Sequence, residues 1–131
     1  MHILLVEDDQ LMRKALANRL QSEGHLVHEA KNGKEALDIV LDNPIDLIIC
    51  DLMMPIISGV TFLNMRNKFM SPDVPVIVTS SLQEAASILT NLGIEYNSFL
   101  HKPFSDEQLL GAIEEAMRHR ENRFKKSTLT H

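Results

Sequence analysis

The sequence predicts an α/β protein built on a doubly wound, five-stranded parallel sheet with five helices. Three short aliphatic runs, at residues 3–6, 45–50 and 74–78, show almost no alternation between apolar and polar residues. Strands covered on both faces by helices have this pattern, and it is typical of parallel sheets. Helical patterns separate the strands, so that strand and helix alternate five times along the 131 residues. This alternation favours crossover connections of one hand.

The other elements complete this order. Two more polar segments, residues 25–29 and 97–100, suit strands at the edges of the sheet. The first three helices are expected at residues 10–23, 32–42 and 58–69. The first of these carries apolar residues at helical spacing and stops before Gly24, and glycine is the residue that most often ends a helix.

Polar residues at the starts of the helices support these boundaries. Asn32 and Ser58 can cap the second and third helices, and we interpret Asp9 as the cap of the first rather than as a metal ligand. Ser81 precedes a Glu by three residues and Ser105 precedes a Gln by three residues. Both are capping boxes, and they predict the last two helices.

Length and composition indicate one globular domain. We expect it over residues 1–122, with residues 123–131, which lose the helical periodicity, as a tail or the start of a linker. The net charge of −5 argues against direct nucleic-acid binding, and no apolar run approaches a membrane span. Without a basic leader at the start of the chain, we expect a cytoplasmic protein. The single cysteine, Cys50, is expected to be a buried small hydrophobe.

Residues able to do chemistry follow four of the strands. Glu7 and Asp8 follow the first strand, Asp51 the third, Thr79 the fourth and Lys102 the fifth. In an open α/β sheet, ligands bind outside the carboxyl ends of the strands, so these side chains should converge. Three adjacent carboxylates repel unless a cation joins them, and their hard oxygen atoms suit Mg²⁺. One carboxylate could then act as a nucleophile and form an acyl phosphate.

Each of these residues has a simpler explanation when it is considered alone. Asp8 could cap a helix, Asp51 could be a turn residue, Thr79 could end a strand, and Lys102 could be a solvated surface lysine. For any one of them the simpler explanation is favoured. Their joint presence at one edge of the sheet reverses that balance and favours a phosphoryl-transfer site.

The same residues resemble the receiver domain of two-component response regulators, over about residues 1–121. The resemblance rests on the acidic run after the first strand, Asp-x-x-Met-Pro-x-x-Ser-Gly at residues 51–59, the Thr79-Ser80 pair and Lys-Pro-Phe at residues 102–104. It implies a flavodoxin-like receiver fold. It also implies that Asp51 accepts a phosphoryl group from a partner histidine kinase or phosphotransfer protein.

The resemblance implies a role for each residue around Asp51. The implied Mg²⁺ ligands are Glu7, Asp8, Asp51 and the backbone carbonyl of Met53. The implied phosphoryl contacts are Lys102, Thr79 and the backbone N–H groups of Leu52, Met53 and Ser80. The bond between Lys102 and Pro103 is similar to the cis peptide of the family.

The resemblance further implies a switch that signals to a downstream protein or output domain. Thr79 would move toward the phosphate, Phe99 would occupy the space that it leaves, and the surface of the fourth helix, fifth strand and fifth helix would change. For Phe99 the alternative is plain core packing. The fourth helix carries apolar residues that are either mostly core or partly a docking surface: Ala85, Ala86, Ile88, Leu89 and Leu92.

Three other functions compete with this switch. A phosphohydrolase with an aspartyl nucleophile usually carries that residue in an Asp-x-Asp motif after the first strand, whereas this chain has Glu7-Asp8-Asp9. A flavodoxin-like cofactor binder would have a phosphate-cradling Ser, Thr or Gly loop at that place. A receiver domain that binds partners without phosphorylation is disfavoured by the complete set of acids, Thr79 and Lys102.

Overall fold

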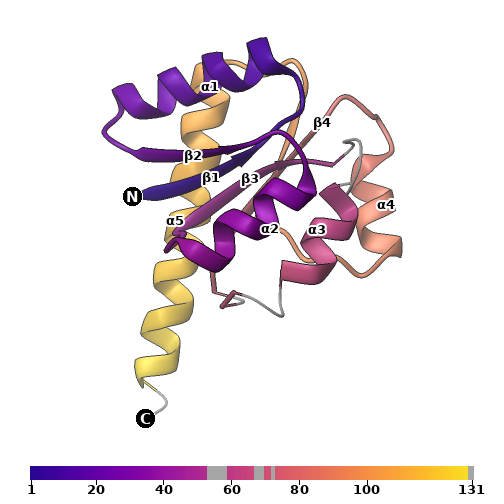
Figure 1. Ribbon diagram of the computed structural model, residues 1–131. Helices are drawn as coiled ribbons and strands as arrows, with labels where there is room; N and C mark the ends of the chain where they lie inside the picture. The colour runs from indigo at the N-terminus through magenta and orange to yellow at the C-terminus, as the bar shows by residue number, and fades with distance from the viewer. Residues whose placement is uncertain (53–58, 67–69, 72, 130–131) are drawn as a thin grey trace.

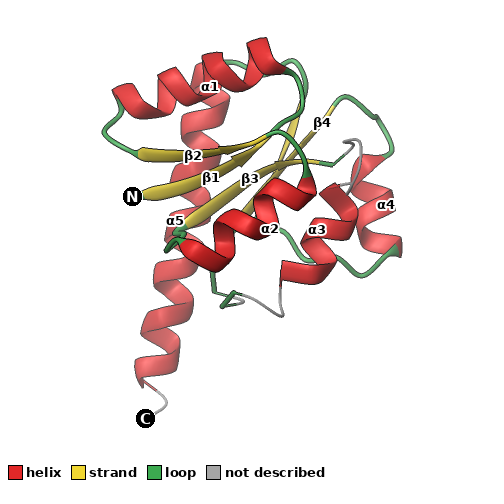
Figure 2. Ribbon diagram, viewed as in Figure 1, coloured by secondary structure: helices red, strands yellow, loops and turns green. Residues whose placement is uncertain are grey.

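The computed structural model describes residues 1–52, 59–66, 70–71 and 73–129, with the backbone alone at residue 119 and residues 121–129. Strand and helix alternate throughout, as the sequence predicts (Figure 2). The strands are β1 (His2–Val6), β2 (Leu26–Ala30), β3 (Leu47–Asp51), β4 (Val76–Ser80) and β5 (Ser98–His101). The helices are α1 (Gln10–Ser22), α2 (Gly33–Asp42), α3 (Gly59–Arg66), α4 (Ala85–Asn91) and α5 (Asp106–Leu129).

All five strands pair in parallel, in the order β2-β1-β3-β4-β5. The two polar strands are therefore the edges, as expected. In Figure 1, α1 and α5 cover one face of the sheet, and α2, α3 and α4 cover the other. The three central strands are almost wholly buried, because helices pack on both of their faces. The chain runs from β1 to β2 on one side and then crosses to β3, β4 and β5 on the other side. The direction of winding therefore changes between β1 and β3, and ligands of doubly wound sheets bind at this point.

Side-chain caps fix the starts of three helices. Asp9 accepts a hydrogen bond from the Met12 N–H at 2.9 Å, which confirms it as the cap of α1. Asn32 caps α2 in the same way. At α5, Ser105 and Gln108 exchange two hydrogen bonds, so this predicted capping box is confirmed.

The capping box predicted at Ser81 does not form. Helix α4 begins at Ala85 after a cap residue, Glu84, that makes no side-chain cap hydrogen bond. The Ser80 hydroxyl instead accepts a hydrogen bond from the Leu82 N–H at 3.1 Å. This local serine turn includes residues 81 and 82, which also belong to the predicted capping box at residues 81–84. The turn therefore competes with the capping box. The expected cap Ser58 of α3 lies outside the described residues.

Helix α5 continues past the expected end of the domain at residue 122. Its backbone remains helical to Leu129, and Figure 1 shows its C-terminal turns extending beyond the sheet. The boundary between domain and tail stays a prediction. Among the helices in the described ranges, none combines the length and the apolar character needed to cross a membrane.

A close backbone approach requires glycine at the start of α3. A Cβ atom at Gly59 would overlap the backbone carbonyl oxygen of Asp51, whereas a Cβ at the exposed Gly111 of α5 would meet nothing within 4 Å. We expect Gly59→Ala to lower the free energy of unfolding by about 1–3 kcal/mol. Gly111→Ala should raise it by up to about 1 kcal/mol, since alanine is the better helix former. Urea titrations of both variants would check this, and an unaffected Gly59→Ala would contradict so close an approach of α3 to β3.

Candidate functional site

Three carboxylates meet at the C-terminal edge of β1 and β3. Glu7 and Asp8 directly follow β1, and Asp51 is the last residue of β3, the neighbouring strand. Glu7 and Asp51 are buried, with 2% and 6% of their surface exposed, and Asp8 is exposed. Each offers one oxygen to a group of atoms that lie within 4.8 Å of one another. The convergence expected from the strand ends is therefore present.

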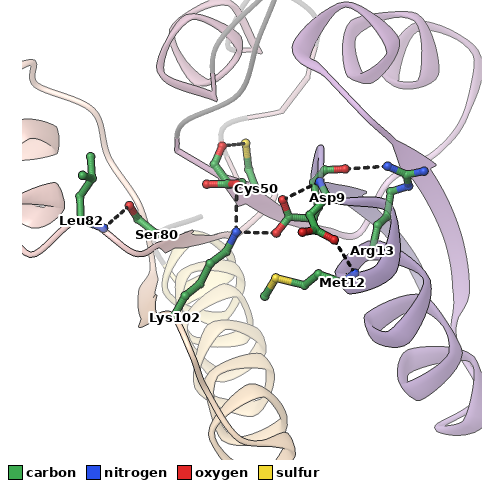
Figure 3. A network of polar contacts seen from close by, with 9 residues as sticks. Asp9, Met12, Arg13, Cys50, Ser80, Leu82 and Lys102 are labelled. Carbon is green, nitrogen blue, oxygen red and sulfur yellow. Dashed lines mark hydrogen bonds and ion pairs between the residues drawn. The ribbon is translucent and has the colours of Figure 1, made fainter.

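Lys102, which follows β5, reaches this acid cluster. Its Nζ atom donates to Glu7 Oε1 at 2.5 Å and to Asp51 Oδ2 at 2.9 Å (Figure 3). The lysine side chain is only 18% exposed. The peptide bond between Lys102 and Pro103 is cis, as the resemblance implies. A half-buried ammonium thus neutralises part of the negative charge of two buried acids.

The electrostatics of the site follow from burial and this pairing. Burial, with repulsion by Asp51, raises the pKa of Glu7 to about 7, although the hydrogen bond from Lys102 opposes the rise. Burial lowers the pKa of the Lys102 ammonium, but its hydrogen bonds to Glu7 and Asp51 outweigh burial and the net pKa is raised. The lysine therefore stays charged at neutral pH. With its pKa near 7, the carboxyl group of Glu7 is close to half ionised at neutral pH. A further cation beside it would favour the ionised form.

Glu7 is also held by its own turn. Its Oε2 atom accepts a hydrogen bond from the Asp9 N–H at 3.3 Å, and its backbone carbonyl accepts one from Arg13 at 2.9 Å. Arg13 is not among the site residues predicted from the sequence. The available signal was its position four residues after the helix cap, where a side chain of α1 can reach back over the turn.

Thr79 stands opposite Asp51 in the register between β3 and β4 and is buried. The backbone N–H of Leu52 donates to the Thr79 carbonyl at 3.0 Å. The Leu52 amide, expected to face a phosphoryl oxygen, is thus engaged within the sheet, because the β3–β4 pairing continues one residue beyond Asp51. Its expected contact with a phosphoryl oxygen stays a prediction. Ser80 lies buried at the end of β4, and Met53 lies outside the described residues.

Phe99 of β5 is half-buried and packs against the apolar core between the sheet and helices α2, α3 and α4. Its ring meets that of Tyr96 edge-on, with centroids 6.4 Å apart. Both the expected core packing and a switch role are compatible with this position. Cys50, next to Asp51, is fully buried as expected, and burial raises the pKa of its thiol, so it remains an inert small side chain.

The sequence matches the family model of the response regulator receiver domain over residues 3–114. It is 36% identical over 117 residues to the probable transcriptional regulator ycf27 of Cyanidium caldarium, covering 89% of this chain and 46% of that protein. It is 38% identical over 118 residues to the sensor kinase CckA of Brucella abortus, covering 88% of this chain and 12% of that protein. The chain spans about half the length, or less, of these curated relatives.

Solved structures show the same fold. The non-phosphorylated HemR receiver domain of Leptospira biflexa matches with a TM-score of 0.78 and 30% identity, covering 88% of this chain and 92% of that one. The response regulator TrrA of Thermotoga maritima, solved in complex with Mg²⁺ and BeF, matches with a TM-score of 0.76 and 29% identity. The match covers 88% of this chain and 97% of that one.

Proposed function

Because the chain belongs to the response regulator receiver domain family, we propose that it is a switch that accepts a phosphoryl group on Asp51. Members of this family are generally phosphorylated on an aspartate by histidine kinases. The observation that carries the proposal is the contact of the Lys102 ammonium with both Glu7 and Asp51, beside Asp8. This arrangement combines a buried carboxylate with a cation that can meet phosphoryl oxygens.

The residues present fit Mg²⁺. Glu7, Asp8 and Asp51 supply the carboxylate oxygens that this ion prefers, and the raised pKa of Glu7 reflects a local excess of negative charge as well as burial. We propose that Asp8 and Asp51 bind the ion directly and that Glu7 acts through a metal-bound water, with the Met53 carbonyl as a further ligand. When bound, the ion would offset the charge of phosphoryl oxygens. The TrrA structure, with its Mg²⁺ and BeF, supports this.

The proposed transfer is a single displacement at phosphorus. A carboxylate oxygen of Asp51 forms a bond to the phosphorus of a phosphohistidine on the partner, while the bond from phosphorus to the imidazole nitrogen breaks. The imidazole leaves with the electron pair and takes up a proton. Lys102 stays fully charged in this step, because its raised pKa keeps the proton on Nζ. The protein contributes position and charge rather than elaborate chemistry.

We further propose that phosphorylation is relayed to the surface formed by α4, β5 and α5. Thr79 would bond a phosphoryl oxygen, with the Ser80 N–H nearby, and Phe99 would move inward. Support comes from the register that sets Thr79 opposite Asp51. Leu92, at the end of α4, is 52% exposed, which suits docking of a downstream protein or output domain. The phosphoryl group must bind one of the two states better, or the equilibrium does not shift.

In this proposal the chain is a cytoplasmic signalling switch that catalyses only its own phosphorylation and dephosphorylation. The nearest competing function is an aspartyl phosphohydrolase, which would use the same nucleophile. The two differ in stoichiometry. A switch takes up one phosphoryl group per chain, whereas a hydrolase turns over many equivalents of substrate.

Intact mass after incubation with acetyl phosphate, with and without Mg²⁺, tests the proposal. We expect one added phosphoryl group that requires both Mg²⁺ and Asp51, so that Asp51→Asn gains none. Asp51→Asn keeps the size of the side chain and serves as the matched control, with its fold checked by circular dichroism. Absence of an adduct on the folded native protein would refute the phosphoacceptor role, and multiple turnovers of acetyl phosphate would favour the hydrolase.

A further inference from the structure

Arg13 of α1 is a half-buried cation that lies beside the acid cluster without contacting its carboxylates in the described structure. Its side chain is 13% exposed. The Nη1 atom donates to the backbone carbonyl of Glu7 at 2.9 Å, and Nε donates to Glu29 Oε1 of β2 at 3.3 Å. Figure 3 shows the guanidinium pointing at the turn that carries Asp9. Arg13 therefore ties the helix to the ends of two strands.

We propose that Arg13 is a positioning residue for the metal site, an inference that rests on the Mg²⁺ binding proposed above. The carbonyl that it holds belongs to the peptide bond between Glu7 and Asp8. The orientation of that peptide plane sets the direction in which the Asp8 side chain leaves the backbone. Asp8 is exposed, so the peptide that carries it, rather than packing, determines where its carboxylate lies.

The other polar groups of Glu7 are held by different partners, and Arg13 is the side chain that binds its backbone carbonyl. The Glu7 N–H donates to the Ala30 carbonyl at 3.0 Å. Its two carboxylate oxygens accept from Lys102 and from the Asp9 N–H. Lys102 and the sheet thus hold the buried side chain and the amide, while Arg13 fixes the peptide plane that follows. Outer residues of this kind orient metal ligands and are commonly worth 10–100-fold in metal affinity.

The ion pair with Glu29 orients the guanidinium group of Arg13. Its carboxylate pairs with Arg13 through Oε1 and with Lys14 through Oε2, at 3.3 Å and 3.1 Å. A planar guanidinium held by a carboxylate on one side presents its remaining N–H groups in a fixed fork. Lys14 is 57% exposed and shares Glu29, but in this structure it does not reach Glu7. The chain thus contains a matched control for the positioning role.

A merely structural role for Arg13 makes a different prediction. An ion pair between α1 and β2 that lies near the surface contributes only modestly to stability. Its loss would lower the free energy of unfolding but leave the Mg²⁺ affinity of the folded protein unchanged. Metal affinity measured on folded protein therefore separates the two roles.

The test is calorimetric titration of Mg²⁺ into the wild type, Arg13→Ala, Arg13→Lys and Lys14→Ala, at pH 8 and at a temperature where all remain folded. We expect Arg13→Ala to raise the dissociation constant at least about 10-fold, and Lys14→Ala to change it less than about twofold. Arg13→Lys should recover only part of the loss, because an ammonium lacks the fork that spans Glu7 and Glu29. Equal affinity in Arg13→Ala and Lys14→Ala would overturn the inference.

Two further measurements separate this inference from the proposed function. With Mg²⁺ in large excess, the wild type and Lys14→Ala should be phosphorylated by acetyl phosphate at the same rate, since Asp51, Lys102 and the proposed metal ligands are intact in both. In metal-free protein, the backbone amide resonance of Asp8 should shift in Arg13→Ala and not in Lys14→Ala. A wild type that binds no Mg²⁺ would defeat the metal site itself, whereas an unmoved Asp8 resonance would defeat the role of Arg13 alone.

Discussion

Replacing Lys102 by Met is expected to slow phosphorylation of Asp51 by acetyl phosphate by at least about 100-fold. The Nζ atom lies 2.5 Å from a Glu7 oxygen and 2.9 Å from an Asp51 oxygen, in a largely buried position. Methionine keeps much of the length and apolar stem of the side chain but removes the charge that would face the phosphoryl oxygens. The rate is measured by intact mass against time, at a Mg²⁺ concentration that saturates each protein.

The same variant should separate the role of the lysine in catalysis from its role in stability. Without metal, the loss of the ammonium leaves Glu7 and Asp51 buried and without their shared cation, so we expect Lys102→Met to lose about 3–5 kcal/mol at pH 8. Mg²⁺ should bind more tightly to this variant, because the competing cation is gone. Lys14→Met, at an exposed lysine, should change neither quantity appreciably. Phosphorylation of Mg²⁺-bound Lys102→Met at the wild-type rate would remove the lysine from the mechanism.

The sheet could be predicted because its determinants are local or periodic. Buried aliphatic runs identified the three central strands, and the more polar residues 25–29 and 97–100 identified the edges, as the order β2-β1-β3-β4-β5 confirms. The acid cluster and Lys102 followed from one topological rule, that parallel strands end at the same side of the sheet. No side-chain geometry was needed to predict that these residues converge.

Other features depend on tertiary detail that spacing does not encode. Arg13 reaches the Glu7 carbonyl only because α1 is rotated so that this side chain, and not Lys14, turns toward the end of β1. The motif at Ser81 matches a capping box, but the hydroxyl of Ser80 closes a competing turn one residue earlier. The Leu52 amide is occupied because β3 and β4 stay paired beyond Asp51. In each case the contact is decided by a specific packing or hydrogen-bonding arrangement that the spacing of residues in the sequence does not reveal.

The contribution of Glu7 to the stability of the metal-free protein should fall as the pH rises from 5 to 8. Burial raises the pKa of Glu7 from 4.5 to about 7 in the folded state. The folded protein therefore holds this proton more tightly than the unfolded chain does. The resulting stabilisation is complete below pH 4.5 and is lost as the pH rises through 7. The expected contribution of this one group is up to about 3 kcal/mol.

Two histidines act in the opposite direction and must be controlled. Burial lowers the pKa of His25 and His28, so their contribution is present above pH 6.5 and is lost as the pH falls. Urea titrations at pH 5 and pH 8 are therefore made in a His25→Asn, His28→Asn background, with and without Glu7→Gln. Glu7→Gln should flatten the decline, because an amide of the same shape does not titrate.

Saturating Mg²⁺ should also reduce the decline in the background protein, since an ion that binds ionised carboxylates stabilises the folded state most at pH 8. Glu7→Gln tests the cause directly, because it removes the titrating group while Asp8 and Asp51 remain. An equal decline with and without Glu7→Gln in metal-free protein would show that the Glu7 carboxyl does not hold its proton more tightly in the folded state. Its carboxylate would then already be ionised at neutral pH before any cation binds.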